Sequence, residues 1–412
     1  MDVLTVFLVI SVVLFFGFLA EFIFRKTSIP DVLLLVLLGL LLGQYGLNLV
    51  QPEQIRNIAP IFTTFALLFL LYDGSFRIDL ASFTREFSKS MQLTWFNFFV
   101  SAFAIASVMM LASFDLKTAL LLGFILGGIS SAFVIPLLRQ LNASKPVISL
   151  LTLESAFTDV ICIVFSLTMM DLIQVGTFSI QTVSSTIVSL FAVAGFVGVV
   201  GGIFWVIVLT KVLRHSNTVN MITVAFLLVV YVVTEYLHGN GAIAGLFFGI
   251  VLKNSLQLKD LLQTVVSGKE KRNPSLHQNN KVGISITTFN EEDFYTEIAF
   301  FVKTLFFVYI GILLNFSNLF AVLIGIITAF VAMAVRPIGS FIISDLKKND
   351  KMLVNAMFAR GIAAAVIAQI AVQRAIPDAV LLSEIIMVFI LGTIVLSSIR
   401  IFLYQRATVI YR

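Results

Sequence analysis

Apolar runs close to the length of a membrane-spanning helix recur from one end of the chain to the other. About twenty consecutive, mostly apolar residues are needed to cross the hydrocarbon core of a bilayer. Hydrophobic residues make up 59% of the 412 positions and charged residues only 12%, about half the charged fraction of an average soluble protein. The sequence therefore predicts an all-α polytopic protein that is embedded in the lipid bilayer.

The apolar runs predict about thirteen transmembrane helices. They cover residues 3–24, 30–49, 57–72, 91–113, 118–140, 147–173, 183–210, 218–237, 241–254, 293–315, 317–340, 351–374 and 380–405. The only cysteine, Cys162, lies within one of these helices, so neither a disulfide framework nor a metal cluster is expected. The net charge of +5 does not indicate nucleic-acid binding, because the basic residues lie in short loops between the apolar runs.

Lysine and arginine are distributed unevenly between the loops on the two sides of the membrane. If the N-terminus is outside, the cytoplasmic loops hold most of the 27 basic residues, and the external loops hold only Arg56, Lys117 and Arg374. Because positive residues favour the cytoplasmic side, we expect an external N-terminus and a cytoplasmic C-terminus in the cell (plasma) membrane. The polar, turn-rich stretch 255–292 is expected to be a cytoplasmic loop of unassigned role.

Two pairs of spans show weak internal symmetry. The second span contains "VLLGLLLGQYGLN" and the ninth "AIAGLFFGIVLKN"; the fifth contains "LGGISSAFVIP" and the twelfth "FARGIAAAV". Each pair lies seven spans apart, and an odd offset means opposite orientation in the bilayer. The pattern predicts two inverted repeats of six helices, joined by the seventh, in which the fifth helix of each repeat is discontinuous and the two breaks cross at the ion site.

Five charged residues lie near the centres of predicted spans: Glu154, Asp159, Lys303, Arg336 and Arg360. An acid at the centre of a membrane helix costs about 2.5–3.5 kcal/mol on insertion scales, so two acids in one span need an explanation. Glu154 and Asp159 are separated by about 140° around a helix and should face different partners. The economical interpretation is that one acid binds an ion while a cationic side chain holds the other.

Asp159 is the predicted ion-binding residue. Ser155 and Thr158 lie next to it in the same span, and the break near Ser130 and Ser131 should free further backbone and hydroxyl oxygens. Hard oxygen ligands of this kind suit Na⁺. A carboxylate that holds either a proton or a cation, but never both, is the minimal machinery of an exchanger.

The other charged residues near the span centres are expected to pair with or neutralise neighbouring groups, and for some of them two partners are possible. Glu154 is expected to form a structural ion pair with a membrane arginine, Arg336 being preferred. Arg360 lies at the second helix break, where it could neutralise either exposed backbone dipoles or the ion-binding acid. Lys303 is expected either to compensate charge in the aqueous funnel or to balance Glu297.

These motifs resemble the cation/proton antiporter superfamily, nearest to its sodium/proton exchanger branch (monovalent cation:proton antiporter type 1). "ESAFTD" at 154–159 resembles the branch's Glu-Ser-x-x-Asn-Asp signature, and "FFVKTLFFVYIG", "AVRPI" and "ARGIAAAV" resemble its tenth to twelfth helices. The resemblance implies a homodimer that works by an elevator-like movement. It implies a scaffold and dimerisation domain (1–90 and 218–316), a mobile core (91–173 and 317–412) and a linker helix (183–210).

The resemblance also carries site residues onto this chain. The family's ion-binding aspartate corresponds to Asp159, its serine ligand to Ser155, and its structural pair to Glu154 and Arg336. Two positions depart from the pattern: Thr158 replaces an asparagine, and "ISSAF" replaces Thr-Asp-Pro. Because one titrating acid is left, the simplest exchange is one proton for one cation, which is electroneutral.

The expected function is antiport of Na⁺ (or Li⁺) against H⁺ for pH and salt homeostasis, with transported ions and no cofactor. The alternative is a K⁺/H⁺ antiporter or K⁺ efflux system; such systems often append a nucleotide-binding domain, which is not expected in a chain that ends at Arg412. An organic-anion symporter would need a roomier polar cavity. An enzyme is not expected, since no zinc spacing and no catalytic Ser/Lys or paired-Asp set occurs at membrane depth.

Overall fold

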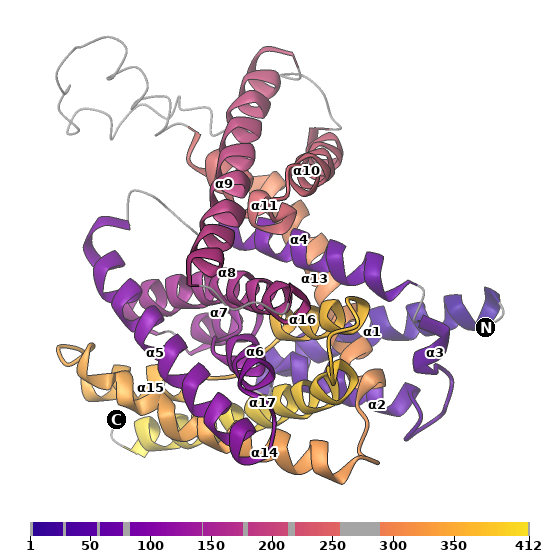
Figure 1. Cartoon of the computed structure of the whole chain (residues 1–412), viewed down its shortest axis with the longest axis vertical. Helices are drawn as coiled ribbons and strands as arrows, with labels where there is room; N and C mark the ends of the chain where they lie inside the picture. The colour runs from indigo at the N-terminus through magenta and orange to yellow at the C-terminus, as the bar shows by residue number, and fades with distance from the viewer. Residues whose placement is uncertain are drawn as a thin grey trace. The chain divides into compact units, whose positions relative to one another are not determined.

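The computed structural model describes residues 3–27, 30–55, 58–76, 83–141, 143–175, 180–212, 219–255 and 289–410. Every regular element within these ranges is helical (Figure 1), which confirms the predicted class. The helices are α1 (Val3–Thr27), α2 (Asp31–Leu42), α3 (Pro52–Ile55), α4 (Ala59–Ser75), α5 (Phe83–Leu111), α6 (Leu116–Leu126), α7 (Ser131–Gln140), α8 (Lys145–Val175), α9 (Ile180–Lys211), α10 (Val219–Tyr236), α11 (Gly241–Lys253), α13 (Phe289–Leu313), α14 (Leu319–Val335), η2 (Arg336–Phe341), α15 (Lys348–Ala356), α16 (Ile362–Gln373) and α17 (Ala379–Ile410). Most of the predicted loop 255–292 lies outside the described residues.

The apolar helices match the predicted spans one to one. Within the described ranges, nine helices are long and apolar enough to cross a membrane. Four shorter apolar helices complete the set of thirteen: Asp31–Leu42, Ala59–Ser75, Gly241–Lys253 and Ile362–Gln373. The chain is therefore a multi-pass membrane protein.

Both predicted helix breaks are present, and they meet. α6 ends at Leu126 and α7 begins at Ser131, whereas α15 ends at Ala356 and α16 begins at Ile362. Glycines at the breaks have low helix propensity and expose the backbone. The backbone N–H of Ser130 donates to the carbonyl of Ala359 at 2.9 Å, so the two interruptions are joined directly. This is the predicted crossing of discontinuous helices.

Helices α2 and α13 approach each other more closely than side chains would allow. A Cβ built on Gly39 would lie 2.7 Å from the Cα of Gly311, and a Cβ on Gly311 would lie 2.8 Å from the Cα of Gly39. Small residues at such crossings let helix backbones pack in direct contact within a membrane. The two helices therefore pack backbone against backbone at this crossing.

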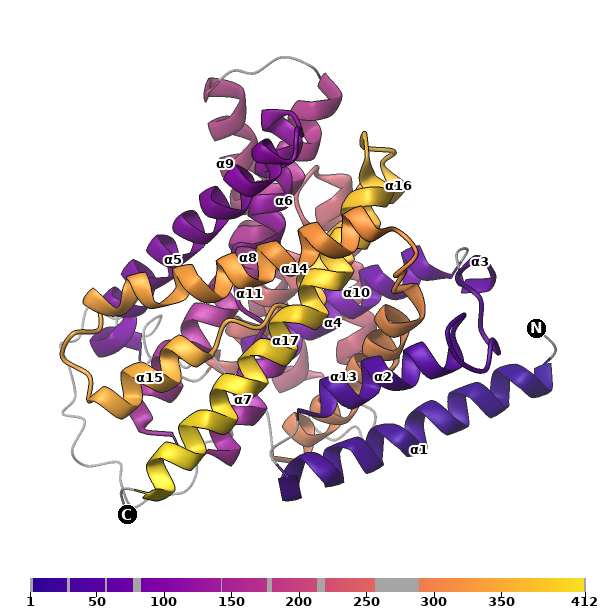
Figure 2. The same ribbon diagram turned by 90° about the horizontal axis from the view of Figure 1, so that it is seen from below.

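The chain divides into two compact units. The first comprises Met1–Leu67, Thr84–Ile187 and Phe300–Arg412, and the second Leu68–Phe83 and Val188–Ala299. In the first unit α14 and α17 lie side by side (Figure 2), and α6, α8 and α16 pack together. In the second unit α9 meets α10 where Trp205 stacks on Phe226, with ring centroids 4.3 Å apart. All of the predicted site residues belong to the first unit.

Candidate ion-binding site

Helix α8 carries the two predicted acids on different faces. The side chain of Glu154 is completely buried, whereas that of Asp159 is 11% exposed. Their angular separation on one helix sends them to different neighbours, as the spacing predicted. The two carboxylates are consequently in unlike environments.

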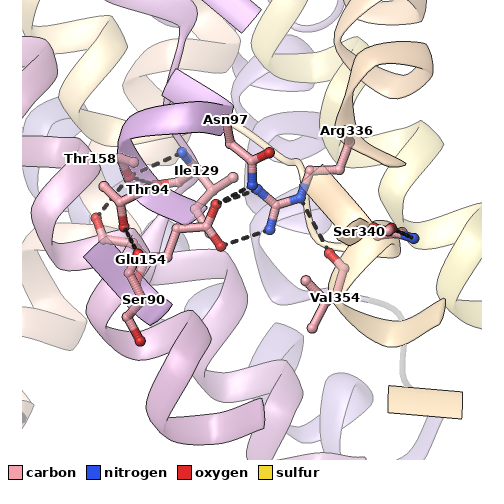
Figure 3. A network of polar contacts seen from close by, with 11 residues as sticks. Ser90, Thr94, Asn97, Ile129, Glu154, Thr158, Arg336, Ser340 and Val354 are labelled. Carbon is pink, nitrogen blue, oxygen red and sulfur yellow. Dashed lines mark hydrogen bonds and ion pairs between the residues drawn. The ribbon is translucent and has the colours of Figure 1, made fainter. Parts of the chain in front are cut away.

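Glu154 lies in a closed ion pair. Arg336 donates from Nη2 to Oε2 at 2.8 Å and from Nη1 to Oε1, and the Nδ2 of Asn97 donates to Oε1 at 2.9 Å. Figure 3 shows the amide of Asn97 and the guanidinium facing the carboxylate from the same side, with Val354 beyond the arginine. The Nε of Arg336 donates to the carbonyl of Val354 at 3.3 Å. A bidentate pair with additional hydrogen bonds is the arrangement that makes a buried charge tolerable.

Asp159 has two weaker contacts. Its Oδ1 accepts from the Nη1 of Arg360 at 3.2 Å, and its Oδ2 accepts from the hydroxyl of Ser131 at 3.2 Å. Charge-assisted hydrogen bonds are usually about 2.7–2.9 Å long. The Asp159 carboxylate is therefore held loosely, and it keeps access to the outside of the protein that Glu154 lacks.

Arg360 is anchored mainly to the broken helix α6. Its Nε and Nη2 donate to the carbonyl of Ile125 at 3.1 and 2.9 Å, and the side chain is fully buried. Ile125 lies in the last turn of α6, where the unsatisfied carbonyls make a negative helix end. Gly128 leaves room for the guanidinium, because a Cβ there would lie 2.8 Å from Nη1.

The two arginines have matching roles. Arg360 joins Asp159 to the carbonyl end of α6, and Arg336 joins Glu154 to the carbonyl of Val354 near the end of α15. Each of the two buried acids of α8, Glu154 and Asp159, thus faces a guanidinium that also bonds to a carbonyl at the C-terminal end of a discontinuous helix. This arrangement explains physically why this apolar helix can bury two acids.

The predicted hydroxyl ligands are only partly brought to Asp159. Ser131 donates to its carboxylate, whereas Thr158 donates to the carbonyl of Ser155 at 3.1 Å and accepts from the N–H of Ile129 at 3.3 Å. The hydroxyl of Ser155 donates to the carbonyl of Thr152 on its own helix at 3.1 Å. Ser130 contributes its backbone to the crossing of the breaks. Thr158 and Ser130 therefore support the break beside the acid.

Lys303 pairs with an acid that sequence reasoning missed. Its Nζ lies 2.5 Å from the Oδ2 of Asp31 in the first turn of α2, whereas Glu297 is exposed. Asp31 was overlooked because an acid in the first turn of a helix usually complements the helix dipole. Asn97 was also missed, although an amide within "LTWFNFFV" is a detectable polar interruption.

The chemistry of the site suits a monovalent cation. Among the described residues no cluster of three or more histidine, cysteine, aspartate or glutamate side chains could hold a metal ion. A single loosely held carboxylate with a neighbouring hydroxyl offers hard oxygen ligands to one small ion or one proton at a time.

Comparisons with known proteins agree with this geometry. The sequence profile described as "Sodium/hydrogen exchanger, transmembrane" matches residues 10–405. "Probable Na(+)/H(+) antiporter 3" of Methanocaldococcus jannaschii is 23% identical over 84% of this chain and 81% of its own length, and "K(+)/H(+) antiporter NhaP2" of Shewanella oneidensis is 25% identical over 56% of this chain and 40% of its own. The solved structure of the sodium proton antiporter MjNhaP1 from M. jannaschii shares the fold, with a TM-score of 0.74 at 20% identity over 98% of this chain and 96% of that one.

Proposed function

The chain belongs to the sodium/hydrogen exchanger family, as its motifs predicted, and we propose from this premise that it exchanges Na⁺ or Li⁺ for H⁺ through Asp159. The family consists of ion antiporters rather than enzymes. The observation that carries the proposal is the difference between the two acids of α8: Glu154 is sealed in a bidentate pair, and Asp159 is partly exposed with two 3.2 Å contacts.

The exchange follows from competition at one carboxylate. An incoming cation displaces the weak contacts from Ser131 and Arg360 and takes the Asp159 oxygens as ligands. Arg360 does not need to leave, because its two bonds to the Ile125 carbonyl hold it in place. A proton on Asp159 neutralises the carboxylate, so that a cation no longer binds. One acid that alternates between one proton and one cation gives electroneutral exchange.

The proposed movement is an elevator-like displacement of the core, residues 91–173 and 317–412, against a scaffold formed by 1–90 and 218–316, with 183–210 as the linker helix. Among the described residues, the side chains that donate hydrogen bonds to the two acids all belong to the proposed core: Asn97, Ser131, Arg336 and Arg360. The complete site could therefore travel as one body. We propose a homodimer in the cell membrane with an external N-terminus and a cytoplasmic C-terminus.

Potassium is the second candidate ion. The break carries "ISSAF" without an acid, so Ser131 contributes a neutral oxygen, and a site with less negative charge has less reason to prefer the strongly hydrated Na⁺. The relative from S. oneidensis is named as a K⁺/H⁺ antiporter, which favours keeping this alternative.

The test is proton flux into proteoliposomes after pulses of Na⁺, Li⁺ or K⁺, for the parent and Asp159→Asn. We expect a cation-dependent flux in the parent and none in the variant, since an amide neither titrates nor carries charge. Asp171→Asn is the matched control: it removes an acid from the same helix, but Asp171 is exposed and paired with Arg374, so flux should persist. Equal responses of the parent and Asp159→Asn to all three salts would overturn the proposal.

A further inference from the structure

A further, largely buried ion pair lies in the described membrane helices, apart from the pairs formed by Glu154 and Asp159. Lys303 on α13 and Asp31 on α2 are joined at 2.5 Å, and their side chains are 14% and 6% exposed. Acids and lysines within membrane spans are expensive and commonly mark ion pathways. Nothing in the exchange at Asp159 uses this pair.

Lys303 has fewer hydrogen-bond anchors than Arg336 and Arg360 have. Glu154 and Arg336 are fixed by a bidentate contact, and Arg360 is fixed by two bonds to a carbonyl. Lys303 reaches Asp31 through one ammonium nitrogen on a flexible four-carbon stem, which rotates away more readily than a guanidinium fork. Because both side chains retain some exposure, another cation could reach the carboxylate once the lysine moves.

The pair lies close to the crossing of the two breaks. Lys303 and Phe307 are four residues apart on α13 and share a face, separated by about 6 Å along the helix axis. The ring of Phe307 packs beside the second break, where a Cβ on Gly361 would lie 3.7 Å from its Cζ. Lys303 therefore lies about one helical turn from the place where Phe307 packs against the second break, which contains Arg360.

The helices that hold the pair belong to the proposed scaffold. α2 and α13 pack backbone against backbone at Gly39 and Gly311, so we expect Asp31 and Lys303 to stay together while the proposed core moves. In the proposed orientation, α2 begins at its cytoplasmic end. The carboxylate also lies at the positive end of α2, which weakens its hold on any cation. A pathway site needs this property, because an ion must be able to leave again.

We propose that Asp31 is a transient binding site for the transported monovalent cation on the cytoplasmic side of the exchange site, and that Lys303 is its tethered competitor. The ammonium group of Lys303 occupies the carboxylate when no ion is present, and an entering cation displaces it before passing to Asp159. The proposal rests on the proposed function, since it concerns the route of the same ion.

The experiment measures the apparent KM for Na⁺ (and for K⁺) in proteoliposomes of known orientation, with the cation applied to either side. We expect opposite effects on the cytoplasmic KM. Asp31→Asn removes the carboxylate and should raise it several-fold, whereas Lys303→Gln removes the competitor and should lower it several-fold. The KM from the other side should change much less. A purely structural pair predicts the same direction for both substitutions, because each breaks the same contact.

The double variant Asp31→Asn/Lys303→Gln removes both charges of this pair, so neither is left without its partner, and it keeps the test decisive if a single variant fails to fold. It should behave like Asp31→Asn, with a raised cytoplasmic KM. Asp171→Asn serves again as the control. If the parent exchanges ions and Asp159→Asn does not, but these variants keep the parental KM on both sides, the inference about Asp31 is wrong and the proposed function stands. If the parent does not exchange, the proposed function itself fails.

Discussion

Glu154 and Asp159 are both carboxylates on helix α8, but they differ in burial and in the number of hydrogen bonds that they accept. Glu154 has three hydrogen-bond donors from Arg336 and Asn97 and no exposure. Asp159 shares its arginine with a backbone carbonyl and retains 11% exposure. Displacing Arg336 from Glu154 would leave a buried charge without a partner, which supports the proposed structural role of this pair. The two longer contacts of Asp159 support its proposed role in exchange.

Replacement of Glu154 by glutamine should destabilise the protein severely. The substitution leaves Arg336 buried without a counter-charge, which costs about 3–5 kcal/mol. Thermal unfolding in detergent measures the loss. Asp171→Asn breaks an ion pair whose side chains are 42% and 37% exposed, and such surface pairs contribute about 0–1 kcal/mol. If Glu154→Gln melts no earlier than Asp171→Asn, the buried pair does not stabilise the fold.

At the scale of elements, the two interrupted helices are the organising feature. Each interruption releases backbone groups that would be costly in lipid. The released groups are satisfied within the protein: Ser130 bonds to Ala359, and arginines cover the carbonyls of Ile125 and Val354. The polar backbone and the two acids are therefore one connected structure, and disturbance of the crossing should disturb the site.

Gly361→Ala tests the crossing directly. An added Cβ would collide with the hydroxyl of Ser130, and overpacking of this kind costs about 1–3 kcal/mol. We expect a lower melting temperature and reduced exchange, with partial recovery in the double variant Gly361→Ala/Ser130→Gly, which removes the colliding atoms.

Gly195→Ala is the control for this experiment. A Cβ at Gly195 would make an ordinary contact, 3.7 Å from the ring of Phe247, and the change from glycine to alanine within a helix favours folding by up to about 1 kcal/mol. Equal melting temperatures for the two single variants would show that the breaks are not packed as described.

The whole molecule has thirteen apolar helical segments among its described residues. In the proposed topology each of them crosses the membrane once, and an odd number of crossings places the two termini on opposite sides. The unit that contains the site is assembled from three separate stretches of the chain, Met1–Leu67, Thr84–Ile187 and Phe300–Arg412. Distant segments must therefore be folded together before either acid has its partner.

Charge balance over the complete cycle gives the prediction at this scale. One proton exchanged for one monovalent cation moves no net charge, so the transport rate should not depend on the membrane potential. The measurement is cation-driven proton flux in proteoliposomes at several imposed potentials, with both ion gradients held constant. A rate that changes steadily with potential would mean that a second titrating group takes part.

Much of this structure was predictable from local pattern. Because polar groups are costly in lipid, the apolar runs of spanning length predicted the number and positions of the membrane helices. The glycine-containing interruptions at matching positions of two spans predicted both helix breaks. The pairing of Glu154 with Arg336 could also be predicted, because a buried acid requires a cationic partner and few basic residues lie within the predicted spans.

Tertiary structure decided the rest, since it depends on which distant groups meet. Lys303 has Asp31 as its partner because α2 and α13 cross at two glycines, and no spacing in the sequence encodes that crossing. Arg360 is anchored on the carbonyl of Ile125, a backbone group that no side-chain pattern reveals. Sequence by itself determined that this chain spans a membrane and carries costly charges within it. Only the packing of remote helices determined which of those charges are sealed and which stay partly exposed, because burial and the number of hydrogen bonds are properties of the assembled fold.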